Sequence, residues 1–94
     1  MLKFEKIKVN DLGQIFQIAK SCFSQSKNLS PRYFERFYLK YPEGFLVAKY
    51  NGKIIGYLIY EIILNDSTKI ISLAILPDYQ RRGIGTYFLN YLFE

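Results

Sequence analysis

Hydrophobic residues recur along the chain with two spacings: every second residue in some segments, which predicts strands, and every third or fourth residue in others, which predicts helices. Residues 2–9 alternate hydrophobe with charge, which predicts a first strand. We interpret Asn10 as a helix cap, because apolar residues then recur every three or four positions over residues 12–23 and predict a helix with one buried face. Residues 24–28 are polar and predict a loop.

A second helix is predicted from the signals at its ends. Ser30 is a capping residue, and Pro31 suits the first helical position because an N–H there would have no helical partner. Pro42 and Gly44 are predicted to end the helix. The face expected to be buried is aromatic and comprises Phe34, Phe37, Tyr38 and Tyr41.

The dipeptide Asn51-Gly52 is the strongest hairpin signal in the chain. It separates residues 45–50 from residues 53–64, both apolar and β-prone, so we expect an antiparallel pair of strands. A turn at residues 65–67 leads to a predicted fourth strand over residues 69–76, and apolar residues recur at helical spacing from residue 84 to the end. The predicted element order is β-α-α-β-β-β-α, in one α/β (α+β) domain over residues 1–94.

The composition favours a folded protein with no membrane segment. Half of the 94 residues are apolar and 18% are aromatic, which is enough for a packed core. The longest apolar run, residues 54–64, is shorter than the ~20 residues that cross a bilayer. The first residues lack the continuous apolar segment of a signal peptide. We therefore expect a cytoplasmic protein.

The residue types present exclude several kinds of site. Cys22 is the only cysteine and there is no histidine, so an internal disulfide, the usual zinc sites and a cysteine nucleophile with a histidine base are all excluded. We expect no bound metal, and we interpret Cys22 as a small buried hydrophobe on a helix. The net charge of +5 would suit a polyanion. Because lysines are interspersed with acids and most tyrosines fall at core-facing positions, we expect no nucleic-acid partner.

Residues 77–86 join a buried strand to a helix and carry the chemistry that the sequence predicts. Such a junction brings unpaired backbone N–H groups to the positive end of the helix dipole, where phosphate binds readily. Gly83 and Gly85 would let a diphosphate approach the backbone, and Arg81 and Arg82 would add charge. The alternative is a plain helix-entry loop with a solvated surface.

The sequence context favours the phosphate site. Residues 71–86 read Ile-Ser-Leu-Ala-Ile-Leu-Pro-Asp-Tyr-Gln-Arg-Arg-Gly-Ile-Gly-Thr. This run resembles the central cofactor motif of the GNAT superfamily of N-acetyltransferases, Gln/Arg-x-x-Gly-x-Gly/Ala after a strand. Within the superfamily it is most similar to the protein N-terminal and ribosomal-protein acetyltransferases. The resemblance extends to the layout of the whole chain and implies a mostly antiparallel sheet with helices on both faces.

The resemblance also implies a cosubstrate and a set of binding residues. Acetyl-coenzyme A (acetyl-CoA) would donate its acetyl group directly to a primary amine, either a protein N-terminus or a small amine, in a ternary complex. Strand residues would offer backbone groups to the pantetheine arm, with an amide near Ile75 stabilising the oxyanion, and the loop amides would wrap the pyrophosphate. The strand residues are Leu73, Ala74 and Ile75, and the loop residues are Gln80, Arg81, Arg82, Gly83, Ile84 and Gly85, with Thr86 at the helix start.

The sequence departs from the family pattern in two respects. The family's chain continues past the last helix into elements that usually supply the general acid, so we expect a truncated domain or a wall supplied by a second copy. Lys69 stands roughly where several relatives place their base, and a cationic lysine is a poor base. The remaining candidates are Glu35, Glu43, Tyr79, Tyr60 and Glu61.

These departures leave two functions open. Tyr60 and Glu61 are the preferred catalytic candidates, because they lie on the central strand near the expected acyl group. The alternative function is a catalytically inactive, CoA-binding interaction module. The isoleucine-rich strand over residues 69–76 has an edge that would be exposed, and together with the last helix this predicts a dimer or higher oligomer.

Overall fold

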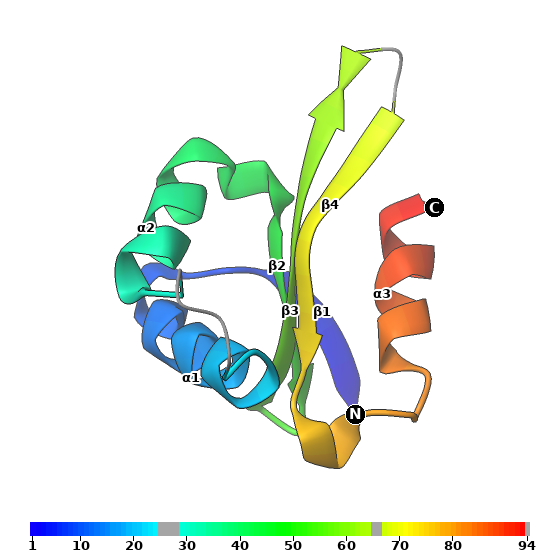
Figure 1. Cartoon of the computed structure of the whole chain (residues 1–94). Coiled ribbons are helices and arrows are strands. Elements are labelled where there is room, and N and C mark those ends of the chain that lie inside the picture. The colour runs from blue at the N-terminus through cyan, green and yellow to red at the C-terminus, as the bar shows by residue number, and fades with distance from the viewer. Residues whose placement is uncertain (25–28, 65–66, 94) are drawn as a thin grey trace.

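A four-stranded antiparallel sheet forms the centre of the protein, in the computed structural model that describes residues 1–24, 29–64 and 67–93. The strands lie in chain order, β1 (Leu2–Lys6), β2 (Phe45–Tyr50), β3 (Lys53–Ile63) and β4 (Ser67–Ile75). Two helices, α1 (Leu12–Cys22) and α2 (Pro31–Lys40), cover one face, and α3 (Ile84–Phe93) covers the other (Figure 1). The predicted element order and the placement of helices on both faces are confirmed.

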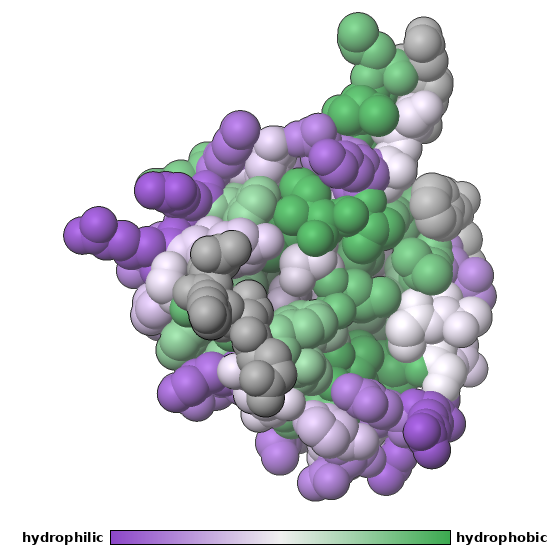
Figure 2. Space-filling model, in the orientation of Figure 1, coloured by the Kyte–Doolittle hydropathy of each residue, from purple (hydrophilic) through white to green (hydrophobic). Residues whose placement is uncertain are grey.

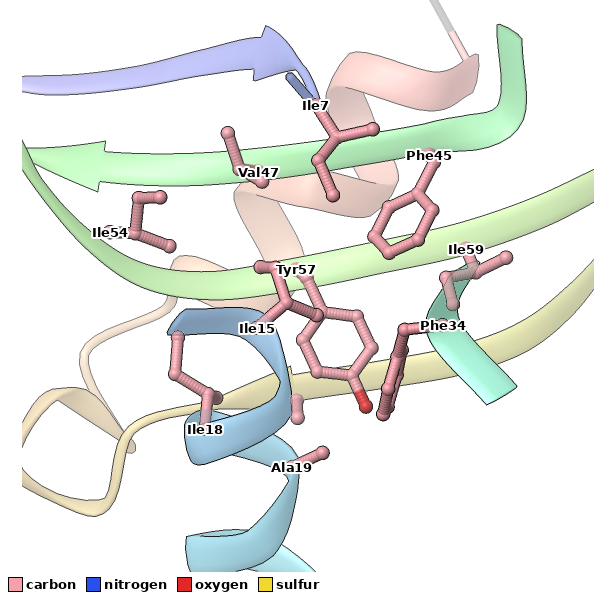
Figure 3. Close-up of a cluster of buried hydrophobic side chains, with 11 residues drawn as sticks. Ile7, Ile15, Ile18, Ala19, Phe34, Phe45, Val47, Ile54, Tyr57 and Ile59 are labelled. Carbon is pink, nitrogen blue, oxygen red and sulfur yellow. The ribbon is translucent and has the colours of Figure 1, made fainter. Parts of the chain in front are cut away.

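Each face of the sheet has its own hydrophobic core, because successive strand residues point to opposite sides. Towards α1 and α2, the fully buried Tyr57 packs edge-on against Phe34 with ring centroids 5.5 Å apart, next to Ile15 (Figure 3). Towards α3, Leu58 of β3 packs with the fully buried Phe88. Burying a side chain of this size contributes about 1.5–3 kcal/mol, so the two cores hold the helices in place.

The hairpin between β2 and β3 forms where the sequence predicts it. Asn51 and Gly52 both have left-handed φ angles, 51° and 85°, as a type I′ turn requires. Farther along β3, Gly56 lies so close to β4 that an added Cβ would be 2.5 Å from Ile75 Cδ1 and 2.8 Å from the Ala74 carbonyl oxygen. Because glycine has no side chain, β3 and the residues of β4 can approach one another closely at this position.

The predicted ends of α2 are confirmed. The Ser30 hydroxyl accepts a hydrogen bond from the Tyr33 amide at 3.3 Å, and Pro31 is the first helical residue. The chain leaves the helix through a 3-10 turn, η2 (Pro42–Gly44). Phe34 is fully buried and the other three predicted aromatic residues are half-buried.

The first strand and the first helix cap differ from the prediction. β1 ends at Lys6, and a 3-10 turn, η1 (Val9–Asp11), follows before α1. The Asp11 carboxylate accepts the Lys8 amide at 3.0 Å and closes this turn. The N-cap residue of α1 is therefore Asp11 and not Asn10, and its side chain makes no capping hydrogen bond to α1. The alternation misleads because Val9, although hydrophobic, is 59% exposed.

The fourth strand is displaced by one or two residues from its predicted bounds. β4 begins at Ser67, two residues earlier than predicted, and ends at Ile75. Residues 65 and 66 of the predicted turn, and residues 25–28 of the predicted loop, lie outside the described residues.

Candidate functional site

The junction between β4 and α3 is a tightly turned loop. A 3-10 turn, η4 (Pro77–Tyr79), follows the strand, and the Gln80 amide donates to the Pro77 carbonyl at 3.2 Å. Arg81 and Gly83 then take left-handed φ angles of 62° and 78°. The first helical hydrogen bond of α3 runs from the Tyr87 amide to the Gly83 carbonyl at 3.0 Å, so the helix begins immediately after the second reversal.

This loop presents a row of unpaired backbone donors. Within the described part of the chain, the amides of residues 81–86 donate to no other protein group. The first amides of any helix lack helical acceptors and lie at the positive end of its dipole, so this row suits an anion such as phosphate. The Gln80 amide, which the resemblance placed in the same row, is instead used by the η4 turn.

The surface above the two loop glycines is open. A Cβ added to Gly83 or to Gly85 would meet no protein atom within 4 Å. Gly83 is required by its positive φ angle, whereas Gly85 is helical and nothing in the protein demands a glycine there. Ile84 between them is buried against Phe88 and anchors the helix start, and Thr86 is exposed.

Positive charge gathers beside the loop. The Arg82 guanidinium lies 5.2 Å from the ring centroid of Tyr79, and the Lys53 ammonium lies 5.8 Å from the same ring. Arg81 is exposed. Among the described residues, none of these three cations has a carboxylate within 4 Å. Their field therefore adds to that of the helix dipole at the loop.

One side of β4 offers its main chain to the outside. The Leu76 amide donates to the Ile55 carbonyl at 2.8 Å. Because main-chain groups of successive strand residues face alternate sides, Ala74 also faces β3, whereas Leu73 and Ile75 face the open edge. Of the three strand residues predicted to meet the pantetheine arm, Leu73 and Ile75 therefore turn main-chain groups to the open edge, and Ala74 turns its main chain towards β3.

A cavity of about 540 Å³ lies along this open edge, on the side of α1 and α2. A hydrophobic band runs over this face of the molecule (Figure 2). Tyr33, Tyr57 and Ser72 bring side-chain hydroxyls to the cavity lining, and the hydroxyls of Tyr57 and Ser72 lie 2.9 Å apart. Burial raises the pKa of Tyr57 to about 12. The lining residues are Phe23, Leu29, Tyr33, Tyr57, Ile70, Ile71, Ser72 and Leu73.

The sequence interpretation missed the pair formed by Tyr57 and Ser72. The two residues lie on neighbouring strands, and only the register between β3 and β4 brings them together. No signal in the sequence singles out the pair, because β3 also carries Tyr60 and β4 also carries Ser67 and Thr68.

The predicted catalytic candidates lie elsewhere. The Tyr60 hydroxyl donates to the Glu43 carbonyl at 3.1 Å, and Tyr60 and Glu61 line a separate cavity of about 550 Å³ together with Tyr91 of α3. Both residues are on β3 towards its outer end, away from the phosphate loop. The other candidates also lie apart from the edge cavity: Glu43 pairs with Lys6, Glu35 is exposed, and Tyr79 packs beside the loop.

The described residues contain neither a cluster of metal ligands nor a membrane-spanning helix. Within residues 1–24, 29–64 and 67–93, no three histidine, cysteine or acidic side chains gather as metal ligands. No helix of the same ranges is long and apolar enough to cross a membrane.

Comparison with known proteins agrees with this geometry. The chain is 28% identical to an N-alpha-acetyltransferase of Sulfurisphaera tokodaii, over 94% of this chain and 58% of that protein. It is 36% identical to the ribosomal protein bS18-alanine N-acetyltransferase of Escherichia coli, over 47% of this chain and 29% of the relative. The chain thus spans little more than half the length of the first of these relatives.

A solved structure has the same fold. The PaiA N-acetyltransferase of Thermoplasma acidophilum, in complex with coenzyme A, superposes with a TM-score of 0.82 at 18% identity, over 98% of this chain and 69% of that one. The model of the Acetyltransferase (GNAT) family matches residues 12–94, which include the loop, the open strand edge and all three helices. The chain therefore belongs to the GNAT family of acetyltransferases.

Proposed function

We propose that this chain binds acetyl-CoA and forms the cofactor side of an N-acetyltransferase that acetylates a primary amine. The observation that carries the proposal is the row of unpaired amides over residues 81–86 at the N-terminus of α3. A protein N-terminus is the favoured acceptor, because two of the relatives are an N-alpha-acetyltransferase and an alanine N-acetyltransferase of a ribosomal protein. A small amine is the other acceptor.

The residues at the junction fit the parts of coenzyme A. The amides of residues 81–86 would hold the diphosphate, with Arg81 and Arg82 pairing with its oxygens. The open main-chain groups of Leu73 and the amide of Ile75 would receive the amide-bearing pantetheine arm, as an edge strand receives another strand. The open space over Gly83 and Gly85 leaves room for the phosphates.

The acetyl group would arrive at the edge cavity. The bound thioester supplies an acetyl group whose transfer to an amine breaks a C–S bond and forms a C–N bond. The Ile75 amide faces the open edge, where a fixed donor can stabilise negative charge that develops on the carbonyl oxygen. The acceptor amine would enter from the side of Tyr57 and Ser72, whose hydroxyls form a hydrogen-bonded pair in that cavity.

A catalytically inactive, CoA-binding module is the second candidate. It is favoured by the residues that line the edge cavity, which include no carboxylate, and by the pKa of Tyr57, which burial raises to about 12. A hydroxyl with so high a pKa is almost entirely protonated at neutral pH, so it is poorly suited to accept a proton from the amine. Tyr60 and Glu61 remain predictions as catalytic residues, and they lie away from that cavity.

Two measurements on the same samples test the proposal. Isothermal titration calorimetry with coenzyme A tests the binding site, with Gly83→Glu as the variant expected to lose binding because it adds a negative charge at a left-handed position. Release of free thiol from acetyl-CoA, with amino-terminal peptides and small amines as acceptors, then separates the enzyme from the inactive module. Absence of binding by the unaltered chain, or equal binding by Gly83→Glu, would overturn the proposed site.

A further inference from the structure

Three elements of the fold meet at one main-chain atom, the carbonyl oxygen of Ile75. The side-chain amide of Gln80 donates to this oxygen at 2.8 Å. The thiol of Cys22, the last residue of α1, donates to it at 3.2 Å. The Gln80 amide nitrogen also lies 3.9 Å from the Cys22 sulfur. We call this arrangement of Gln80, Cys22 and the Ile75 carbonyl the strand clamp.

The strand clamp occupies a carbonyl that would otherwise be open. Ile75 faces the free edge of β4, so no neighbouring strand supplies donors to it. A carbonyl oxygen has two lone pairs, and here the amide and the thiol take one each. The amide group of Gln80 must present its nitrogen rather than its oxygen to both acceptors, which determines its orientation.

Gln80 stands at the start of the phosphate loop, immediately before the left-handed Arg81. Its backbone amide is already held by Pro77, so the hydrogen bond from its side chain is what ties the loop back to the strand edge. Cys22 ties the same point to α1 across a sequence separation of 53 residues. The distance and angle between the loop amides and the edge of β4 therefore depend on this contact.

We propose that Gln80 and Cys22 are positioning residues that set the phosphate loop against the free edge of β4, so that one coenzyme A molecule meets both at once. The inference rests on the proposed function. A ligand held at two places gains from the second contact only if the two places are correctly spaced. A loosened clamp should therefore weaken a ligand that spans both places and leave unchanged a ligand that occupies the loop alone.

The Cys22 thiol is suited to this role. Burial is the largest influence on it and raises the pKa of the thiol above its ordinary value of 9.0, so it keeps its proton and remains a donor at neutral pH. A serine at this position would retain a donor and an alanine would not. Cys22→Ser and Cys22→Ala are therefore a matched pair.

Calorimetric titration with coenzyme A and, separately, with adenosine diphosphate tests the clamp. Coenzyme A spans the loop and the strand edge, whereas adenosine diphosphate carries the diphosphate without the pantetheine arm. For Gln80→Met, which has a similar length but no donor, we expect coenzyme A affinity to fall about threefold to tenfold, as for one lost hydrogen bond, and adenosine diphosphate affinity to change less than about twofold. Gln80→Arg keeps a donor and should restore the ratio of the two affinities.

The outcomes separate the inference from the proposed function. If the unaltered chain binds neither ligand, the proposed phosphate site is wrong, and the proposed role of the clamp is wrong as well. If the unaltered chain binds both, and Gln80→Met loses neither or loses both in parallel, the clamp is wrong while the site stands. Tighter coenzyme A binding by Gln80→Met would also overturn it, since it would mean that the ligand must displace Gln80. The same two titrations on Cys22→Ala and Cys22→Ser test the contact that α1 makes with the Ile75 carbonyl. Thermal melting confirms that each variant is folded.

Discussion

At the scale of single residues, the two glycines of the phosphate loop have different physical roles. Gly83 has a φ angle of 78°, which disfavours any other residue whatever the available space. Gly85 has no such constraint, and a Cβ there meets no protein atom within 4 Å. A requirement for glycine at residue 85 therefore has to come from a ligand rather than from the fold.

Gly85→Ala should separate stability from binding. Alanine is a better helix former than glycine, so we expect the free energy of unfolding to rise by about 0.5–1 kcal/mol. We expect coenzyme A affinity to fall, because the methyl group extends into the space left for the phosphates. Urea unfolding and calorimetry measure the two effects. If Gly85→Ala binds coenzyme A as well as the unaltered chain does, that result would contradict a diphosphate seated at this turn.

A second prediction at this scale concerns how the free energy of unfolding depends on pH through Tyr57. Its folded-state pKa is raised from 10.0 to about 12, chiefly by burial, so folding favours the neutral hydroxyl. The stability it contributes is fully present below pH 10 and is lost as the pH rises from 10 through 12. Unfolding measured between pH 8 and about 11.5 should show a smaller alkaline loss for Tyr57→Phe than for the unaltered chain. Equal losses would show that Tyr57 is not the group whose titration destabilises the fold.

At the scale of elements, the site is made by the relation between β4 and its neighbours rather than by β4 itself. Gly56 allows β3 to approach β4 closely, and the register that follows places Ser72 beside Tyr57. The same pairing leaves the main chain of Leu73 and Ile75 on the open edge. A change between the two strands should therefore affect both the core and the site.

Gly56→Ala tests this relation against Gly13→Ala. The added methyl at residue 56 would lie 2.5 Å from Ile75 Cδ1 and 2.8 Å from the Ala74 oxygen, so β4 must shift. We expect a loss of about 1–3 kcal/mol in the free energy of unfolding and weaker coenzyme A binding. Gly13, in α1, has no atom within 4 Å of its Cβ position, so alanine there should be neutral or stabilising. Similar thermal midpoints for the two variants would show that the close approach is not needed.

At the scale of the whole molecule, the edge of β4 is open in the described part of the chain. The radius of gyration, 12.7 Å, is close to the ~12 Å of a compact chain of this length, so the described elements pack as one body with an exposed edge strand. Ile70 of this strand is 38% exposed, and Ile62 and Ile63 are exposed at the adjacent end of β3. An apolar edge strand with free main-chain groups is prone to pair with another copy.

We propose that two copies associate through this edge and that coenzyme A opposes the association. The pantetheine arm and a second β4 strand would need the same main-chain groups, those of Leu73 and the amide of Ile75. Sedimentation at tens of micromolar protein should show a dimer whose fraction falls as coenzyme A is added. Association that coenzyme A leaves unchanged would place the contact elsewhere, for instance on the exposed Tyr87 and Tyr91 of α3. A strict monomer would contradict the proposal entirely.

The local sequence determined the elements of this protein, because their signals act over a few residues. Asn51-Gly52 marks the hairpin, Ser30-Pro31 marks the start of α2, and Gly83 marks the turn into α3. The same short range explains the error at residues 9 and 10, where alternation continued past the last paired residue and a 3-10 turn closed by Asp11 took its place.

The tertiary structure decided how these elements combine into a site. No local pattern specifies that Cys22 and Gln80 meet at the Ile75 carbonyl, or that Tyr57 lies beside Ser72, because each contact depends on strand register and helix packing between distant segments. The motif over residues 80–86 could be recognised from the sequence, since a loop between a strand and a helix carries its own amides. The direction in which each strand residue turns its main chain could not, because it is set by hydrogen bonds to a neighbouring strand.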